Sequence, residues 1–484
     1  MELKDLSLKQ IISEIKSGKI SQKEVYDYFL DRIRKFDPQI EAFNFVNEDF
    51  QEKDSNSILA GVPIGVKDLF CEKGIRTTAS SIMLKDFIPP YDSSIIKNLK
   101  DAGFSSIGKL NLDEFAMGGS GENSALRITK NPWDISRIPG GSSSGSAASV
   151  ASGMVPAALG TDTGGSIRQP ASMCGVVGFK PTYGRNSRWG IIAMASSLDT
   201  PGTFTKTVED AGLLYEIMSG HDPLDSTSID AGNKINPEIW DKKDLKGIKI
   251  GVPKEYFIDG IDSGVKSEIE KAISKLKELG AEIIDISLPH SEYGLAVYYI
   301  IMPAEVSTNL ARYDGIRYGH ANDVGLEIND MMKKNRAEGF GKESQRRIML
   351  GSFVLSSGFY DAYYKKASLV RGLINKDFDD AFKNVDIIIT PTAPSVAWKT
   401  GEKVDDPLKM YLSDIFTVNG SLAQLPGLSI PVGYAKPETG EDIELPVGIQ
   451  ILGPKFGEEK VFEVGHVLEN SLKEYINSRK PEIF

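Results

Sequence analysis

The chain is 484 residues long, with 40% hydrophobic and 25% charged residues, and it is therefore long enough to bury a large core. Its net charge of −11 disfavours direct binding of a phosphate backbone, so we expect any nucleic acid to be held by another subunit. Cys71 and Cys174 are the only cysteines, which excludes a disulfide framework and favours a cytoplasmic protein. There is no signal-peptide pattern, no apolar run long enough to span a membrane, and no zinc-ligand spacing among the four histidines, so we expect no metal site.

Two capping boxes mark the beginning of the chain as helical. Ser7 precedes Gln10, and Ser21 precedes Glu24, by the three residues that separate the two members of a capping box. Apolar residues then recur at helical intervals after each serine. The pattern predicts two helices before residue 50.

Short apolar runs broken by glycine and proline follow, and they predict strands. The predicted strands span residues 62–70, 104–110, 155–160, 245–253, 281–289, 385–394, 427–434 and 445–454, with helices at 93–103, 144–154, 264–280 and from 458 onward. This alternation indicates an α/β fold with a central mixed sheet covered by helices on both faces. Because no compositional break marks a linker, we expect one domain over residues 51–484, preceded by a helical N-terminal extension over residues 1–50.

Two local motifs point to other kinds of site, and the sequence around each argues against them. The run Gly103–Leu110 matches the phosphate-loop spacing, but it has Leu110 in place of the magnesium-binding hydroxyl and leads from a helix into a strand, the reverse of a phosphate loop. The run Gly141–Gly145 fits the nucleophile elbow with Ser143 as nucleophile, but an elbow needs an apolar strand directly before it. The preceding NPWDISRIPG is polar and broken by prolines.

A third pattern combines three residues that are distant in the sequence. Two Gly-Gly-Ser triplets carry Ser142 and Ser166, and Lys67 follows the apolar run PIGV. Serine is a weak nucleophile until a base takes its proton, a buried neutral lysine can be that base, and a second hydroxyl can relay the proton. Spacing alone leaves an ordinary loop with a strand-end lysine equally open. The backbone N–H groups that could stabilise an oxyanion are those of Thr163, Gly164, Gly165 and Ser166.

These residues lie in stretches that resemble the amidase-signature family of Ser–Ser–Lys amide hydrolases. The stretches are GVPIGVKD, PGGSSSGSAA and GTDTGGSIRQPASMCGVVGFKPTYGR, and the resemblance extends over almost the whole chain. It implies that Lys67 is the general base, that Ser142 is the bridging serine after a cis peptide bond from Gly141, and that Ser166 forms the acyl-enzyme. Ser144 stands where many members have glycine, a departure that leaves the triad unchanged.

Further stretches resemble the members of this family that serve as the glutaminase subunit of a tRNA-dependent amidotransferase. They are NLDEFAMGGSGENS, SSLDTPG, NLARYDGIRYG, EGFGKESQRRIMLG and SGFYDAYYKKA. The resemblance implies that glutamine is hydrolysed and that two partner subunits, of the B and C types, use the ammonia to amidate Glu-tRNA(Gln) or Asp-tRNA(Asn). It also implies that this subunit needs no cofactor, that ATP and Mg²⁺ act at a partner, and that mischarged tRNA is bound mainly there. The alternative is a stand-alone amidase of small amides.

The same resemblance implies a glutamine pocket. Arg347 is expected to bind the carboxylate, with its neighbour Arg346 as the alternative, and Asp414 to bind the ammonium. Tyr298 is expected to line the pocket, and Arg168 to brace the Ser166 loop without touching glutamine. The stretch TVNGSLAQLPG departs from the family pattern at three positions, which are Asn419, Gly420 and Gln424.

Overall fold

The structure is a computed structural model that describes residues 2–232, 234–257, 260–322 and 325–484. The strands are β1 Phe43–Val46, β2 Pro63–Lys67, β3 Ser105–Leu110, β4 Ala157–Asp162, β5 Val177–Lys180, β6 Thr200–Thr205, β7 Lys249–Pro253, β8 Glu282–Ile286, β9 Ile387–Pro391, β10 Gly427–Ala435 and β11 Leu445–Leu452. The main helices are α1 Leu8–Lys16, α2 Gln22–Ile40, α3 Ser94–Asp101, α4 Ser144–Ala151, α5 Arg168–Cys174, α6 Val208–Met218, α7 Ser263–Glu278, α8 Gly294–Asn309, α9 Ile328–Gly339, α10 Lys342–Leu355, α11 Lys366–Ala381, α12 Pro407–Tyr411, α13 Val418–Leu422 and α14 Glu458–Asn477.

Within the described ranges, eleven strands form one mixed sheet in the order β1-β3-β2-β4-β6-β5-β10-β11-β9-β7-β8. The β2 strand is parallel to both β3 and β4. Neighbouring strands are antiparallel along the series β4, β6, β5, β10, β11 and β9. The β7 strand is parallel to both β9 and β8. The prediction of a mixed sheet is confirmed. The predicted β-α-β unit near the middle of the chain is also confirmed, as β7, α7 and β8.

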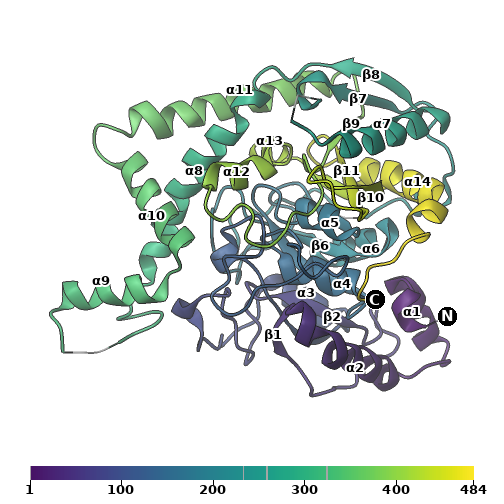
Figure 1. Ribbon diagram of the computed structural model, residues 1–484. Coiled ribbons are helices and arrows are strands. Elements are labelled where there is room, and N and C mark those ends of the chain that lie inside the picture. Colours follow the sequence, from purple (N-terminus) through teal and green to yellow (C-terminus); the bar gives the residue numbers. More distant parts are fainter. Residues whose placement is uncertain (1, 233, 258–259, 323–324) are drawn as a thin grey trace.

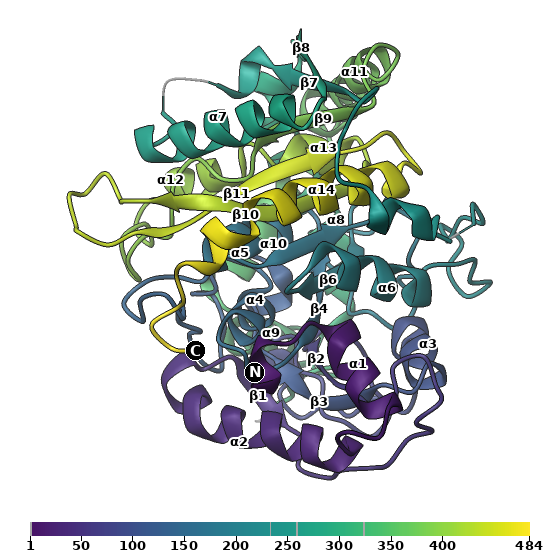
Figure 2. The ribbon, with the colours of Figure 1, turned by 90° about the vertical axis from the view of Figure 1, so that its right-hand side faces the viewer.

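Helices cover both faces of the central strands, as predicted. Every residue of β2, β4, β5, β6, β9 and β11 is buried, and a strand that is buried at each successive residue must be covered on its two faces. Helices α4 and α5 pack on each other and on the sheet, and α6 and α14 form a second such pair. Figure 2 shows α6, α7 and α14 in front of the strands, and Figure 1 shows α8, α10 and α11 along one side of the molecule.

The beginning of the chain packs against the first half of the sheet. Both capping boxes are present, with the Ser7 and Ser21 hydroxyls accepting from the backbone of Gln10 and Glu24. The strand β1, which lies before residue 50, pairs with β3 and so belongs to the central sheet. The predicted domain boundary at residue 50 stays a prediction. The two ends of the chain meet, since Lys4 Nζ donates to the Phe484 carbonyl at 3.4 Å (Figures 1 and 2).

The fold contains neither a phosphate loop at Gly103–Leu110 nor, in its described part, a membrane-spanning helix. Gly103 lies in the turn between α3 and β3, with a φ of 82°. The stretch is therefore a turn from a helix into a strand, whereas a phosphate loop leads from a strand into a helix. Among the described residues, no helix is both long and apolar enough to cross a membrane.

Candidate active site

The centre of the site is built where two parallel strands end side by side. The β2 strand ends at Lys67, and its neighbour β4 ends at Thr161 and Asp162. Parallel neighbours present their carboxyl ends at the same edge of a sheet, which brings the side chains of these residues together. Lys67 Nζ lies 2.8 Å from Thr161 Oγ1. The candidate site is therefore built at the edge of the sheet where β2 and β4 end.

Lys67 is fully buried and reaches the first Gly-Gly-Ser triplet. Its Nζ lies 3.0 Å from Ser142 Oγ and 2.8 Å from Ser143 Oγ. Burial lowers the pKa of Lys67 to about 7, while the carboxylates of Asp113 and Asp162 act in the opposite direction. A large fraction of this amine is therefore neutral near pH 7, as a general base requires.

The two adjacent serines precede α4 and are held by the backbone around them. The Gly141–Ser142 peptide bond is cis, as the resemblance implied. The Ser142 carbonyl accepts from the Asp113 N–H at 3.1 Å. Ser143, which sequence reasoning considered only as an elbow nucleophile, donates through Oγ to the Thr161 carbonyl at 3.3 Å. The residues before Gly141 form no named strand, so the context that a nucleophile elbow needs is absent here.

The loop that carries Ser166 is organised by one carboxylate. Asp162 Oδ1 accepts from the Gly165 N–H at 2.8 Å, and Oδ2 accepts from the Ile167 N–H at 3.2 Å. Burial by itself would raise the pKa of Asp162, but the charge and hydrogen bonds of Arg168 lower it to about 2. Asp162 therefore stays ionised and keeps the loop folded around it.

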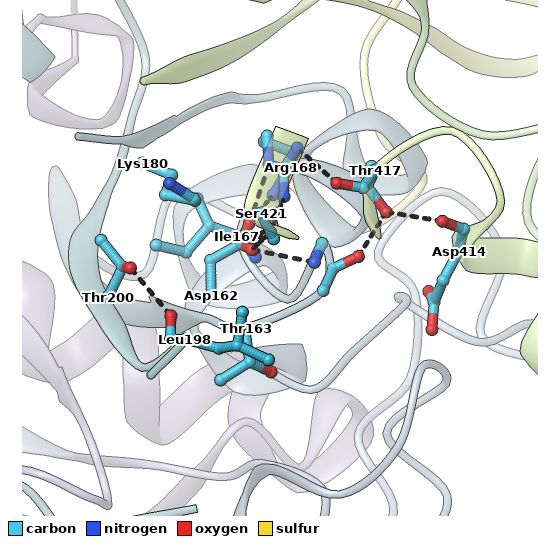
Figure 3. A network of polar contacts seen from close by, with 12 residues as sticks. Asp162, Thr163, Ile167, Arg168, Lys180, Leu198, Thr200, Asp414, Thr417 and Ser421 are labelled. Atoms are coloured by element: carbon cyan, nitrogen blue, oxygen red, sulfur yellow. Dashed lines mark hydrogen bonds and ion pairs between the residues drawn. The ribbon is translucent and has the colours of Figure 1, made fainter. Parts of the chain in front are cut away.

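Arg168 packs against this loop through the Asp162 carboxylate. Figure 3 shows its guanidinium between Asp162 and Thr417. Its three nitrogens make hydrogen bonds to the Asp162 carboxylate, the Thr417 carbonyl, Gln450 Oε1 and Ser421 Oγ. The side chain is fully buried. These contacts agree with the expected role of a brace for the Ser166 loop.

Ser166 is the most accessible member of the proposed triad, with 8% of its surface exposed, while Lys67 and Ser142 have none. Its carbonyl accepts from the Ser143 N–H at 3.3 Å, which places the two Gly-Gly-Ser segments in direct contact. In the part of the chain that the structure describes, the Ser166 and Ser142 hydroxyls share no hydrogen bond. Catalytic hydrogen bonds are often long in a free enzyme and tighten when substrate binds.

The four predicted oxyanion donors are not equivalent. The Gly165 N–H is already engaged by Asp162 at 2.8 Å. The N–H groups of Thr163, Gly164 and Ser166 have no acceptor among the described residues, so they are the ones available to a developing oxyanion. The oxyanion site stays a prediction, with these three donors favoured by the hydrogen bonding.

The residues expected to bind glutamine lie next to this loop. Tyr298, on α8, has its hydroxyl 3.0 Å from Thr163 Oγ1. The Tyr299 hydroxyl donates to Asp414 Oδ2 at 3.3 Å, and Asp414 lies in the turn just before α13. Burial raises the pKa of Asp414 to about 7, although the Arg347 charge lowers it. The carboxylate is therefore close to half-ionised at neutral pH before a cation enters.

The structure distinguishes the two adjacent arginines of α10. The Arg347 side chain is 5% exposed and the Arg346 side chain is 49% exposed. Arg347 Nε donates to Glu343 Oε1 at 2.8 Å, and its guanidinium lies over the rings of Tyr299 and Tyr411, with 5.4 Å and 5.7 Å to the ring centroids. Arg347 faces inward toward the tyrosines, so it is the arginine that can reach a ligand beside Asp414.

The positions where the sequence departs from the family pattern have defined local roles. Ser144 opens α4, and Asn419 donates to the Ser291 carbonyl at 3.1 Å. Gln424 has a φ of 63°, in the left-handed region that glycine adopts without strain. Gly420 lies against Arg168 and Leu452, where a Cβ atom would come within 3.1 Å of Leu452. These four positions therefore shape the surroundings of the site and add no group to the proposed triad.

The fold and the arrangement of these residues define an amide hydrolase of the amidase family. The chain belongs to this family, whose model, described as Amidase, matches residues 24–462. The chain is 52% identical to the A subunit of glutamyl-tRNA(Gln) amidotransferase from Carboxydothermus hydrogenoformans, over 97% of this chain and 98% of that protein. It is 51% identical to the protein of the same name from Thermoanaerobacter pseudethanolicus, with 98% of each chain covered.

Solved structures support the same family at the level of the fold. The crystal structure of the A subunit of glutamyl-tRNA(Gln) amidotransferase from Thermotoga maritima is 40% identical, with a TM-score of 0.81 and coverage of 97% of this chain and 95% of that one. The peptide amidase from Stenotrophomonas maltophilia is 26% identical, with a TM-score of 0.78 and 98% of each chain covered. The family fold therefore occurs both in a peptide amidase and in a component of an amidotransferase.

Proposed function

We propose that this chain is the glutaminase subunit of a tRNA-dependent amidotransferase. The observation that carries the chemistry is the buried Lys67, which has a pKa lowered to about 7 and lies 3.0 Å from Ser142 Oγ. The assignment to an amidotransferase is supported by relatives of that name that are about half identical over nearly the whole chain. The site chemistry and the relatives point to the same reaction class.

In the proposed reaction, Ser166 Oγ attacks the side-chain carbonyl carbon of glutamine. The Ser166 proton passes through the Ser142 hydroxyl to neutral Lys67, and the carbonyl oxygen becomes an oxyanion that the loop N–H groups stabilise. When the intermediate collapses, the carbon–nitrogen bond breaks and the proton returns through Ser142 to the leaving nitrogen, so that ammonia departs. Water then attacks the glutamyl ester by the same route, which releases glutamate and restores Ser166.

The substrate is held at its amino-acid end, away from the bond that breaks. Arg347 binds the α-carboxylate: its Nε is fixed by Glu343 and its Nη1 lies 3.6 Å from the weak acceptor Met302 Sδ, while Nη2 has no hydrogen-bond acceptor among the described residues. Asp414 binds the α-ammonium, and the incoming positive charge favours its ionised form. Tyr298 lines the pocket, with its hydroxyl 3.0 Å from Thr163 Oγ1. The two charges therefore fix the direction in which the carboxamide points.

The remaining parts of the reaction belong to partners. Two further subunits, of the B and C types, use the ammonia to amidate mischarged Glu-tRNA(Gln) or Asp-tRNA(Asn), with ATP and Mg²⁺ acting at a partner and no cofactor in this chain. The net charge of −11 fits this division, because a subunit that does not grip tRNA needs no basic surface. Such a complex works in the cytoplasm.

A direct test follows ammonia release from glutamine by the purified complex. Ser166→Ala is expected to abolish release, because the proposed acyl-enzyme forms on the Ser166 hydroxyl. Full activity of Ser166→Ala would refute the mechanism. The alternative, a stand-alone amidase of small amides, is tested by purifying the chain alone: turnover of simple amides without any partner, and no requirement for glutamine, would favour it.

A further inference from the structure

Thr417 connects the Ser166 loop to the turn that carries Asp414. It is fully buried and precedes α13, three residues after Asp414. Its Oγ1 lies 2.5 Å from the Gly164 carbonyl oxygen and 3.1 Å from the Asp414 carbonyl oxygen. Figure 3 shows this residue between Arg168 and Asp414. In the sequence, Thr417 is the first residue of the stretch TVNGSLAQLPG, but no motif gave it a role.

The peptide group between Gly164 and Gly165 is held at both of its polar ends. Its carbonyl accepts from Thr417 Oγ1 at 2.5 Å, and its N–H donates to Asp162 Oδ1 at 2.8 Å. A peptide group is planar, so fixing its oxygen and its nitrogen fixes its orientation. The Gly164 N–H and the Ser166 N–H lie on the two sides of this peptide, and both are predicted oxyanion donors. Their directions therefore depend on the two contacts.

Close packing reinforces the hydrogen bond. Gly165 has a φ of 138°, and a Cβ atom placed on it would come within 2.2 Å of Thr417 Oγ1. The absence of a side chain on Gly165 lets Thr417 approach the loop closely. Arg168 Nη1 donates to the Thr417 carbonyl at 3.0 Å, so the same guanidinium braces both Asp162 and Thr417.

Thr417 is also bonded to the proposed ammonium site. Its N–H donates to the Asp414 carbonyl at 3.0 Å, so the two residues share one tight turn. A ligand that pulls on the Asp414 carboxylate acts on the turn that holds the Gly164 carbonyl. The chain of contacts runs from Asp414 through Thr417 to the Gly164–Gly165 peptide without a gap.

We infer that Thr417 is a positioning residue that orients the oxyanion loop and ties it to the amino-acid pocket. The inference rests on the proposed function in that Ser166 is taken as the nucleophile. Thr417 touches no reacting atom and acts through the Gly164–Gly165 peptide. Loss of its hydroxyl leaves the Gly164 carbonyl without its donor and frees the peptide to rotate, which misdirects the N–H groups beside it.

The test compares three variants of the full chain, purified with its partners. Thr417→Val keeps the shape but removes the donor, Thr417→Ser restores the donor, and Thr203→Val is a matched control. Thr203 is buried in β6 and its hydroxyl has no hydrogen-bond partner within the described structure. Thermal unfolding of each variant reports folding separately from activity.

Steady-state glutamine hydrolysis gives the first readout. Thr417→Val is expected to lower kcat about 10- to 100-fold and to change KM by less than about threefold, because the transition state needs the loop N–H groups more than the bound substrate does. Thr417→Ser and Thr203→Val are expected to stay within about threefold of the unmodified chain. An unchanged kcat in Thr417→Val would overturn the inference, and so would an equal loss of kcat in Thr417→Ser.

Labelling of Ser166 by a fluorophosphonate, followed by mass spectrometry, gives the second readout. The reagent needs an active serine and its oxyanion donors but no amide substrate, so Thr417→Val should slow labelling about as much as it lowers kcat. If the unmodified chain is labelled but does not hydrolyse glutamine, the proposed function fails while labelling still tests Thr417. Equal labelling rates in the unmodified chain and Thr417→Val would overturn the inference on Thr417 alone.

Discussion

Arg168 and Asp162 form a salt bridge in which neither side chain is exposed to solvent. Arg168 Nη2 lies 2.9 Å from Asp162 Oδ1, and Nε lies 3.0 Å from Oδ2. An arginine has five N–H donors, and the five hydrogen bonds of this guanidinium account for all of them. The guanidinium of Arg168 is therefore fully engaged within the protein, and Arg347 stays the arginine that we expect to bind a substrate carboxylate.

Removing the Arg168 charge should destabilise the fold. Arg168→Met leaves the Asp162 carboxylate buried without its cation, and breaking a buried pair from one side costs about 3–5 kcal/mol. We expect a loss of that size in the free energy of unfolding, measured by urea denaturation. Arg34→Met, on an exposed arginine, should leave the midpoint nearly unchanged. An unaltered midpoint for Arg168→Met would show that the salt bridge contributes nothing to stability.

The rate of glutamine hydrolysis should rise with pH through the pKa of Lys67. Burial lowers this pKa to about 7, so the amine is mostly charged below that pH and mostly neutral above it. A general base acts only when neutral, and we therefore expect kcat at saturating glutamine to rise about tenfold between pH 6 and pH 8. Saturation with glutamine keeps Asp414 paired, so that kcat reports Lys67.

Lys67→Arg is the control for this profile. An arginine stays protonated at every accessible pH, so the variant should be inactive from pH 6 to pH 8. A pH profile that stays flat in the unmodified chain, or activity in Lys67→Arg, would exclude Lys67 as the base.

The two serines that contact Lys67 should differ in their effect on catalysis. Ser142 and Ser143 lie 3.0 Å and 2.8 Å from Lys67 Nζ, so distance alone does not separate them. The Ser143 hydroxyl donates to the Thr161 carbonyl, which occupies its proton, and Ser142 makes no such bond within the described structure. Ser142→Ala should lower kcat at least about 100-fold, and Ser143→Ala less than about tenfold. The reverse order, measured by ammonia release, would assign the relay to Ser143.

The two adjacent arginines of α10 provide a matched pair for the glutamine pocket. Arg347→Ala should raise KM for glutamine about 100-fold, since a charge-assisted contact to the α-carboxylate is lost. Arg346→Ala removes an exposed side chain of the same type one residue away and should leave KM within about twofold. Equal effects of the two variants on KM, with unchanged thermal unfolding, would remove Arg347 from the pocket.

The strands and helices with a regular apolar pattern were predictable, and those without one were not. The β2, β4, β9, β10 and β11 strands are short apolar runs, and the predictions for them are confirmed. By contrast β6, with the sequence TPGTFT, is polar and contains proline and glycine, yet it is fully buried between β4 and β5. Its place in the sheet comes from its neighbours, which no local pattern expresses.

Some residues of the candidate site were likewise predictable from the sequence and others were not. Lys67, Ser142 and Ser166 were predicted because their motifs are long and specific, whereas no motif indicated the contacts of Thr161 or Thr417. Ser143 fitted the elbow spacing, but nothing in the sequence indicated its contact with Lys67. The contact of Thr161 with Lys67 depends on two strands ending at the same edge of the sheet. The contact of Thr417 with Gly164 joins residues more than 250 positions apart.

The reaction class could be predicted from the amino-acid sequence, because the family motifs contain a lysine, two serines and a glycine-rich loop in fixed order. The sequence did not show which of the polar groups near these motifs are free to act. In the folded chain, burial lowers the pKa of Lys67 to about 7. Arg347 is buried while Arg346 is exposed, and both Arg168 and the Gly165 N–H are hydrogen-bonded to Asp162. The physical reason is that desolvation and hydrogen-bond partners depend on neighbours in space, which come from distant parts of the chain.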